Sequence, residues 1–289
     1  MKVIVASSDK NRIEERVAVH SLIKAGHSLD EIDIVDGDTG FIYDALREKT
    51  PRVTGLGDLG GSTSFTMARL FIPLFYDDDR IVVVDSDVIA FRHLNGMFGK
   101  QAKPGIYVRR AYAPGEWATS VMGWVLSPEI RELLPNYRSL IEGKEFSWED
   151  KIYLKKSFLM AIKIPLNRID KSWNSFDNIT NRTNLVHFTN LAAQPWKTNE
   201  HPFENEWFKC AKEALDFGRL TSHDIETHAS HKDICLAGVP LLRGDFIDRL
   251  HADNVKLSLR LWFRTRALLI YRNIMFFTPI RYICSVLLR

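Results

Sequence analysis

The most constraining feature of the chain is a run of four apolar residues, Ile81–Val84, that ends directly in Asp85, Ser86 and Asp87. A continuous β-branched run of this kind is typical of a central strand that is buried on both faces of a sheet. In open α/β sheets, ligands bind at the carboxyl ends of the strands, which is where these two carboxylates would lie. Carboxylates spaced in this way can bind Mg²⁺ or Mn²⁺, although an acidic surface turn produces the same string.

The N-terminal part of the chain predicts a β-α-β unit. The apolar run Lys2–Ala6 meets polar residues 7–9, as expected for a buried strand that ends in a loop. Helical periodicity over residues 13–25 stops at Gly26, a typical residue just beyond a helix C-terminus. With a second strand over residues 32–35, the unit predicts an α/β fold with a mainly parallel central sheet flanked by helices.

An apolar helix is predicted over residues 65–75, after a glycine-rich loop, and it contains Arg69. An arginine in such a helix either has a buried partner or extends to the surface. Further strands are predicted over 105–108, 121–126 and 185–188, and further helices over 128–134, 149–159 and 205–217.

His187 lies on the last predicted strand and precedes a turn that is rich in Asn, Gln and Pro. Its imidazole can supply a nitrogen ligand to the cation predicted at Asp85 and Asp87, with polar groups nearby for phosphate. Taken alone, a histidine on an apolar strand is more often a hydrogen-bonded core residue.

Together these motifs resemble the family 8 glycosyltransferases, the retaining GT-A group that includes glycogenin and bacterial lipopolysaccharide galactosyl- and glucosyltransferases. The resemblance covers residues 2–207. It consists of T-S-F-T-M-A-R-L-F-I-P (63–73), R-I-V-V-V-D-S-D-V-I-A (80–90), W-N (173–174), V-H-F-T-N (186–190) and Q-P-W (194–196), in the family's order and spacing. It implies transfer of a hexose from a UDP-sugar to a glycan or lipid-linked acceptor, such as a lipopolysaccharide or other envelope polysaccharide.

The resemblance also implies roles for individual residues. Asp85, Asp87 and His187 would bind Mn²⁺ or Mg²⁺, which would bridge the donor diphosphate. Ser86 would lie near the ribose and Arg69 near the donor sugar. The remaining positions implied for the nucleotide-sugar are Ala6, Ser7 and Asp9 after the first strand, and Asn190, Gln194 and Lys197 after His187.

The catalytic residues implied by the family are Glu149, Asp150 and Arg69. Glu149 and Asp150 stand where the family has a D-Q-D element, and Glu149 is a candidate nucleophile. Its alternative role is that of an exposed carboxylate at a helix N-terminus. The chain departs from the family at Gln194, where a phosphate-binding Lys is usual, and Lys197 is the candidate substitute.

The charge distribution separates the C-terminus from the rest. The formal net charge is +3, and seven Lys and Arg lie after residue 255 with no Asp or Glu, so the preceding part carries −4. We therefore predict a catalytic domain over residues 1–250 and a basic amphipathic tail over 251–289. Basic residues recur among large aliphatic and aromatic ones, which favours binding to an anionic membrane surface over nucleic acid. A helix packed on the body and a contact in a homo-oligomer are the alternatives.

Three widely spaced cysteines form no disulfide framework, and no signal-peptide pattern or membrane-spanning stretch precedes residue 255. These observations predict a cytoplasmic enzyme attached peripherally to the inner face of the cell membrane. Two rival functions stay open. One is an Mg²⁺-dependent phosphatase of the haloacid dehalogenase type, whose nucleophile motif resembles the D-S-D string. The other is a catalytically dead module that binds a nucleotide-sugar.

Overall fold

The computed structural model describes residues 1–53, 64–190, 194–196, 201–221 and 223–225. The chain forms two compact units, Met1–Thr189 and Asn190–Arg289, which are described separately. The predicted boundary near residue 250 and the basic tail lie outside the described residues, so both stay predictions.

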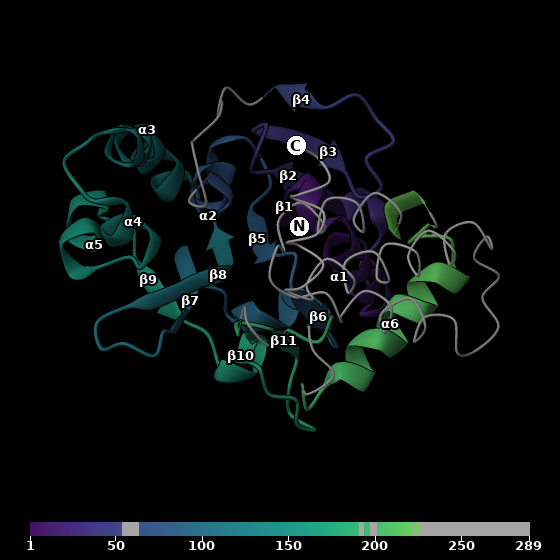
Figure 1. Ribbon diagram of the computed structural model, residues 1–289. Coiled ribbons are helices and arrows are strands. Elements are labelled where there is room, and N and C mark those ends of the chain that lie inside the picture. Colours follow the sequence, from purple (N-terminus) through teal and green to yellow (C-terminus); the bar gives the residue numbers. More distant parts are fainter. Residues whose placement is uncertain (54–63, 191–193, 197–200, 222, 226–289) are drawn as a thin grey trace, which may run out of the picture. The chain divides into compact units, whose positions relative to one another are not determined.

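An eight-stranded sheet forms the centre of the first unit, in the order β4-β3-β2-β1-β5-β8-β7-β9 (Figure 1). Its strands are β1 (Lys2–Ser7), β2 (Ile32–Asp36), β3 (Phe41–Asp44), β4 (Arg52–Val53), β5 (Arg80–Asp85), β7 (Gly105–Arg110), β8 (Trp117–Val125) and β9 (Leu166–Arg168). Strand β5 lies in the middle of the order, and Ile81–Val84 are fully buried. The prediction of a central strand that ends at Asp85 is confirmed.

The α/β class is confirmed, but the sheet is mixed rather than mainly parallel. The centre, β2-β1-β5, is parallel, as the β-α-β unit predicted. Strand β8 then pairs antiparallel with both β5 and β7, and β3 pairs antiparallel with β2 and β4. The β2–β3 connection is only four residues long, too short for the crossover that parallel neighbours need.

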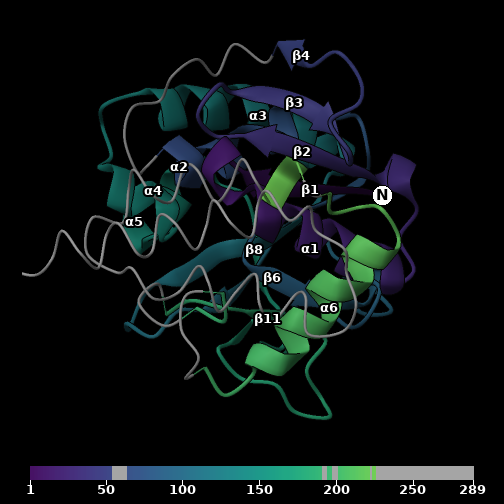
Figure 2. The same ribbon diagram turned by 45° about the vertical axis from the view of Figure 1, so that its right-hand side comes forward.

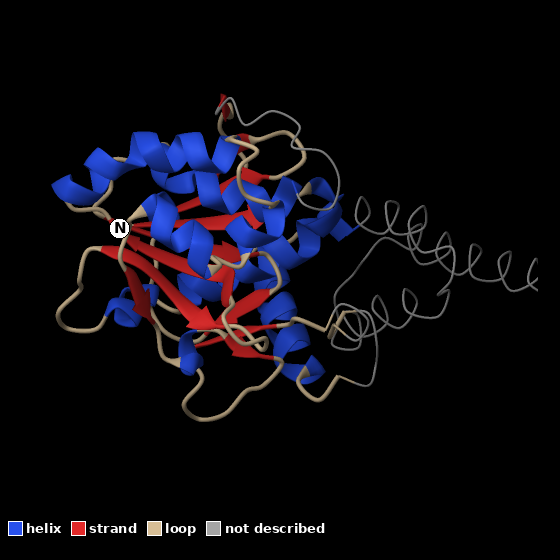
Figure 3. Ribbon diagram, turned by 90° about the vertical axis from the view of Figure 1, so that its left-hand side faces the viewer, coloured by secondary structure: helices blue, strands red, loops and turns tan. Residues whose placement is uncertain are grey.

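Helices cover both faces of this sheet (Figures 2 and 3). They are α1 (Arg12–Lys24), α2 (Ser64–Phe71), α3 (Pro128–Glu142), α4 (Trp148–Ile152) and α5 (Lys156–Ile162). Side chains alternate between the faces of each strand, so β1 contributes Ile4 and Ala6 to a core beneath α2–α5, and Val3 and Val5 to a core beneath α1. The central strand faces are thus largely apolar on both sides.

Three predicted helices differ from those observed. The helix predicted over 65–75 ends at Phe71, because Pro73 cannot continue the α-helical hydrogen bonds, and a 3₁₀ turn follows. The helix predicted over 149–159 is broken between α4 and α5, where buried Leu154 adopts a left-handed φ of 44°. Helix α3 continues to Glu142, well beyond the predicted residue 134. Gly26, with φ of 105°, ends α1 as predicted.

A second, three-stranded sheet of this unit has the order β10-β11-β6. Its strands are β10 (Ser175–Phe176), β11 (Leu185–His187) and β6 (Val88–Ala90). In the described part of this unit the 3₁₀ turns are η1 (Asp9–Asn11), η2 (Leu29–Glu31), η4 (Ile72–Leu74), η5 (Leu94–Phe98) and η6 (Lys171–Trp173).

In the second unit, helix α6 (Glu204–Asp216) corresponds to the helix predicted over 205–217. Its buried side includes Trp207, whose ring lies 5.1 Å from that of Trp196. None of the helices in the described ranges is both long and apolar enough to span a bilayer.

Candidate metal and donor site

The two aspartates lie where the chain passes from one sheet to the other. Asp85 is the last residue of β5, and its backbone pairs with Ala6 of β1. The chain turns at Ser86 and Asp87 and then enters β6 at Val88. Because β1, β2 and β5 are parallel, the carboxyl ends of all three lie at one edge of the sheet. The sequence prediction that Asp85 and Asp87 lie at this edge is confirmed.

Pairing of β11 with β6 places His187 beside the aspartates. His187 is opposite Val88 in the antiparallel register, and the Phe188 N–H donates to the Asp87 carbonyl at 3.0 Å. Strand pairing thereby brings His187 next to two aspartates that precede it by about 100 residues in the sequence.

The three side chains form one compact group. His187 Nε2 lies 3.1 Å from Asp87 Oδ1 and 4.0 Å from Asp85 Oδ2. One ligand atom from each residue lies within 4.8 Å of the others. The Asp85 and His187 side chains are largely buried, whereas that of Asp87 is 18% exposed, so the group opens toward solvent on the Asp87 side.

Arg69, on α2, is the buried counterion of this group. Its Nη1 donates to both carboxylate oxygens of Asp85 at 3.0 Å, and its Nε donates to the Thr66 carbonyl at 2.9 Å. The residue is only 5% exposed, so the alternative in which it extends to the surface is wrong. Arg69 therefore fixes the orientation of the Asp85 carboxylate.

Burial and charge compete in setting the ionisation of the group. Burial raises the pKa of Asp85 to about 6, against the opposing effect of Arg69. Burial lowers the pKa of His187, but the Asp87 and Asp85 carboxylates outweigh this effect and raise its pKa above the usual value. The two carboxylates thus favour a positive charge beside them, which either a proton on His187 or a bound cation can supply.

A divalent cation satisfies this requirement. Two carboxylates and one imidazole form a donor set that suits Mn²⁺ and Mg²⁺, with open positions for oxygen ligands. The buried Nδ1 of His187 accepts and donates no hydrogen bond within the described part of the chain. It can therefore carry the ring proton while Nε2 faces a cation. The predicted ligands Asp85, Asp87 and His187 thus fit a divalent metal.

Several predicted donor-binding residues lie at the same edge of the sheet. Ala6 adjoins Asp85, Ser7 adjoins Asp36 at the ends of β1 and β2, and both are buried, as is Ser86. Asp9, in contrast, is exposed and pairs with Arg47 at 3.2 Å. Contact of these residues with a nucleotide stays a prediction.

Arg47 is a residue that the sequence did not indicate. Its side chain is 7% exposed and pairs with Glu15 at 2.7 Å and with Asp36 at 2.9 Å, besides Asp9. It therefore links α1, the end of β2 and the loop after β1. No local pattern around residue 47 predicts this, because its partners lie 11 to 38 residues away.

The predicted catalytic carboxylates lie at the N-terminus of α4. Asp150 Oδ2 accepts from the Ser147 N–H at 3.1 Å, and the Asp150 N–H donates to the Ser147 hydroxyl at 3.1 Å, which forms a capping box. The Ser147 hydrogen bonds lower the pKa of Asp150. Glu149 is exposed and lies 3.7 Å from Lys155. Asp150 thus has a structural role, and a catalytic role for either residue stays a prediction.

The remaining predicted donor ligands belong to the second unit. Asn190 is exposed and Gln194 is buried, while Lys197 lies outside the described residues. Their part in phosphate binding stays a prediction.

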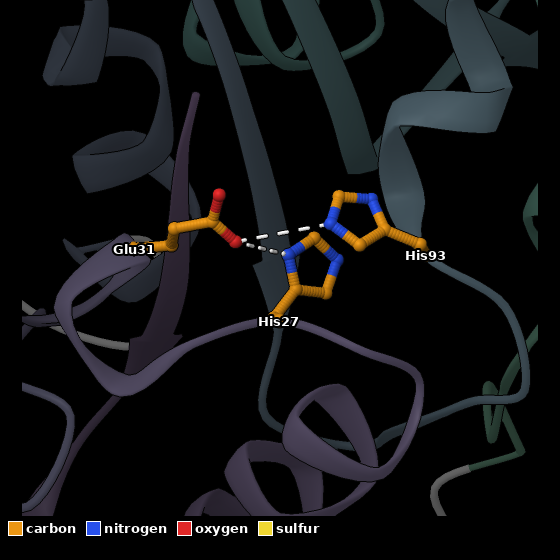
Figure 4. Close-up of side chains that lie close together, drawn as sticks. All are labelled: His27, Glu31 and His93. Carbon is orange, nitrogen blue, oxygen red and sulfur yellow. Dashed lines mark hydrogen bonds and ion pairs between the residues drawn. The ribbon is translucent and has the colours of Figure 1, made fainter.

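A second histidine–carboxylate group lies near the amino end of β2 (Figure 4). Glu31 Oε2 is 3.0 Å from His27 Nδ1 and 3.8 Å from His93 Nε2, and the two imidazoles stack at 3.8 Å. However, His27 Nε2 accepts the Leu94 N–H at 3.0 Å, so the ring proton must be on Nδ1, where a metal would bind. Although its spacing suits a metal, this group is a hydrogen-bonded structural contact.

The described fold has counterparts among solved structures. The bifunctional glycosyltransferase WbbM matches with a TM-score of 0.54 and 12% identity, over 79% of this chain and 51% of WbbM. The glycosyltransferase GlyE of Streptococcus pneumoniae TIGR4 matches with a TM-score of 0.51 and 16% identity, over 73% of this chain and 59% of GlyE. The fold is that of the GT-A glycosyltransferases.

The chain thus spans between half and three fifths of the length of these two proteins. No protein-family model matches the sequence, and no curated protein sequence matches it. The structural likeness, at these identities, concerns the fold.

Proposed function

We propose that the protein is a metal-dependent, family 8-like retaining glycosyltransferase. It transfers a hexose from a UDP-sugar to a glycan or lipid-linked acceptor, such as a lipopolysaccharide or another envelope polysaccharide. The observation that carries this proposal is the convergence of Asp85 at the end of β5, Asp87 in the turn that follows and His187 of β11 in a group that suits one divalent cation.

The fold and the location of the group support this function over other uses of a metal. The group lies at the carboxyl edge of the parallel strands β2-β1-β5, where α/β folds bind nucleotides. Ala6, Ser7 and Ser86 supply small side chains at this edge, so a flat base and a ribose can approach the backbone. The GT-A fold is consistent with a nucleotide-sugar donor.

Breaking the bond between a sugar and a nucleoside diphosphate builds negative charge on the leaving phosphate. A bound Mn²⁺ or Mg²⁺ supplies Lewis-acid stabilisation of that charge. The chain's own residues hold the ligands: Arg69 orients Asp85 through two hydrogen bonds, and β6–β11 pairing orients His187. The proposal includes contact of Arg69, Glu149 or Asp150 with the donor sugar or acceptor, with Glu149 as the candidate nucleophile.

The basic segment 256–289 completes the proposal by holding the enzyme on an anionic membrane surface. Vesicles that contain phosphatidylglycerol should sediment the full-length protein, and vesicles of phosphatidylcholine alone should not. Substitution of Arg260, Arg264 and Arg266 by Glu should abolish the sedimentation. Undiminished sedimentation of that variant would exclude the segment as the anchor.

The enzymatic proposal is tested by UDP release from UDP-glucose, UDP-galactose and UDP-N-acetylglucosamine, with Mn²⁺ or with EDTA. At least one donor should be turned over with Mn²⁺ alone, and Asp87→Asn should abolish the turnover. Glu31→Gln is the matched control, because it alters a carboxylate beside a histidine at the other end of the sheet.

The rival functions give different outcomes in the same assays. Hydrolysis of p-nitrophenyl phosphate with Mg²⁺, without donor turnover, would identify the haloacid dehalogenase-type phosphatase. Binding of UDP with Mn²⁺ but turnover of none of the three donors would identify a dead binding module.

A further inference from the structure

A pocket of about 580 Å³ lies in the first unit, and none of its described lining residues belongs to β1 or β2. Its walls come from the end of β7 with the loop that follows, and from the segment between β9 and β11. The lining has four kinds of side chain: the cations Arg109, Lys171 and Arg182, the carboxylate Asp170, the aromatic rings of Tyr112 and Phe176, and several hydroxyl and amide groups.

Phe176 joins this pocket to the proposed metal ligands. It lines the pocket, and it pairs with His187 in the parallel register of β10 and β11. The two rings meet edge to face, with centroids 6.1 Å apart. In addition, the Asp177 N–H donates to the His187 carbonyl at 3.0 Å. A molecule in the pocket is therefore one side chain away from the imidazole of His187.

Within the described ranges none of these cations forms a close ion pair, although the Asp170 carboxylate interacts electrostatically with Arg109 and Lys171. The Arg109 guanidinium stacks on the Phe176 ring at 3.8 Å and donates to the Asn174 carbonyl, which fixes its position. Lys171 and Arg182 are exposed at the rim. Asp170 is the single acidic residue of the lining. Its Oδ1 accepts a hydrogen bond from the Ser172 N–H at 2.9 Å.

Three cations against one carboxylate in a concave site create a positive potential that attracts an anion. The fixed fork of Arg109 suits a phosphate or carboxylate in particular. The Tyr112 ring is 78% exposed and lies 4.9 Å from that of Phe176. Exposed rings of this kind offer an apolar surface to the C–H face of a sugar, while the hydroxyl and amide groups suit its hydroxyls.

We propose that this pocket binds the acceptor, and that the acceptor sugar held there carries a phosphate or a carboxylate. This inference rests on the proposed glycosyl transfer, because it assigns the second substrate to the space beside the donor site. Arg109 positions the anionic group, and Lys171 and Arg182 attract it at the rim.

Ligand-observed NMR on the full-length protein tests this proposal with three probes: N-acetylglucosamine 1-phosphate, glucuronic acid and uncharged glucose. Both charged sugars or one of them should bind at least about tenfold more tightly than glucose, and their comparison separates phosphate from carboxylate. The double variant Lys171→Ala/Arg182→Ala should weaken binding of the charged sugars by about tenfold or more. Lys171 and Arg182 are exposed, whereas Arg109 packs on Phe176, so this double variant leaves that packing intact.

Arg138→Ala/Lys144→Ala is the matched control, since it removes two exposed charges elsewhere, and it should bind the probes as the wild type does. Equal binding of glucose and the charged sugars, or undiminished binding by the Lys171/Arg182 variant, would overturn the proposal. Stabilisation by UDP with Mn²⁺ is recorded in parallel and should be unchanged in both variants. Its absence in the wild type would instead count against the donor site.

Discussion

Two groups of histidine and carboxylate side chains in this protein look alike by spacing and differ in chemistry. One is Asp85, Asp87 and His187 at the carboxyl ends of the strands, and the other is His27, Glu31 and His93 near their amino ends. In both, a carboxylate lies about 3 Å from an imidazole nitrogen. Distance alone therefore does not separate a metal site from a structural hydrogen bond.

The difference lies in the second nitrogen of each buried ring. A backbone N–H from Leu94 points at His27 Nε2 and keeps the proton on the nitrogen that faces Glu31. No described group constrains Nδ1 of His187, so Nε2 is free to bind a cation. The carboxylates differ too, because two converge on His187 and only one lies beside His27 and His93. We therefore expect variants of the two groups to affect different properties.

The largest expected difference is in catalysis. Asp87→Asn should reduce Mn²⁺-dependent UDP release by about 100-fold or more, the size of effect typical of removing one group from a preorganised site. Glu31→Gln should stay within about twofold of the wild type. Comparable losses in the two variants would show that the groups are not functionally distinct.

The second largest difference between the two histidine–carboxylate groups is expected in the binding of metal and donor. With UDP and Mn²⁺ at about 100 times the dissociation constant, the wild type should be stabilised by about 2.7 kcal/mol, and EDTA should reverse this. His187→Gln should lose the stabilisation in differential scanning fluorimetry. His93→Ala should keep it, and a loss there would place the metal at the wrong end of the sheet.

Removal of the structural histidine should affect folding rather than activity. His27→Ala leaves the Leu94 N–H without its acceptor and removes a stacked ring, which should cost about 1 to 3 kcal/mol of unfolding free energy. Urea unfolding measures this cost. His93→Ala, at the more exposed ring, serves as the comparison and should cost less.

The smallest expected effect is a pH dependence of stability. Burial lowers the pKa of His27 below its usual 6.5, with Glu31 opposing this shift and His93 adding to it. The unfolded chain therefore binds a proton before the folded chain does, so stability is complete above pH 6.5 and falls as the pH drops toward the lowered pKa. His27→Gln should reduce the fall in urea midpoint between pH 7.5 and 5.5, and an equal fall in both proteins would assign it to other groups.

The sequence predicted those features that depend on local pattern. The run Ile81–Val84 and the position of Asp85 follow from β-branched residues in a row, and Gly26 ends α1 because only a left-handed residue suits that turn. The resemblance supplied His187 as a partner of Asp85, a contact that strand pairing creates and periodicity does not reveal.

Features that depend on contacts between distant segments were not predicted. Strand β8 pairs antiparallel with β5, but its apolar residues would follow the same pattern in a parallel neighbour, so the sequence does not reveal its direction. The local pattern predicts an unbroken helix through Leu154. The helix breaks there instead, and the Leu154 side chain is buried in the core. No sequence motif marks Arg47 or the pocket cations Arg109 and Arg182, and only the fold shows which residues surround them.

The central claim is that Asp85, Asp87 and His187 hold one divalent cation that carries a nucleoside diphosphate. Titration of the protein with Mn²⁺ in the presence of UDP, with free Mn²⁺ measured by electron paramagnetic resonance, tests it most directly. We expect one tightly bound ion per chain in the wild type and in Glu31→Gln, and none in the double variant Asp87→Asn/His187→Gln. Retention of one tightly bound ion by that double variant would contradict the account.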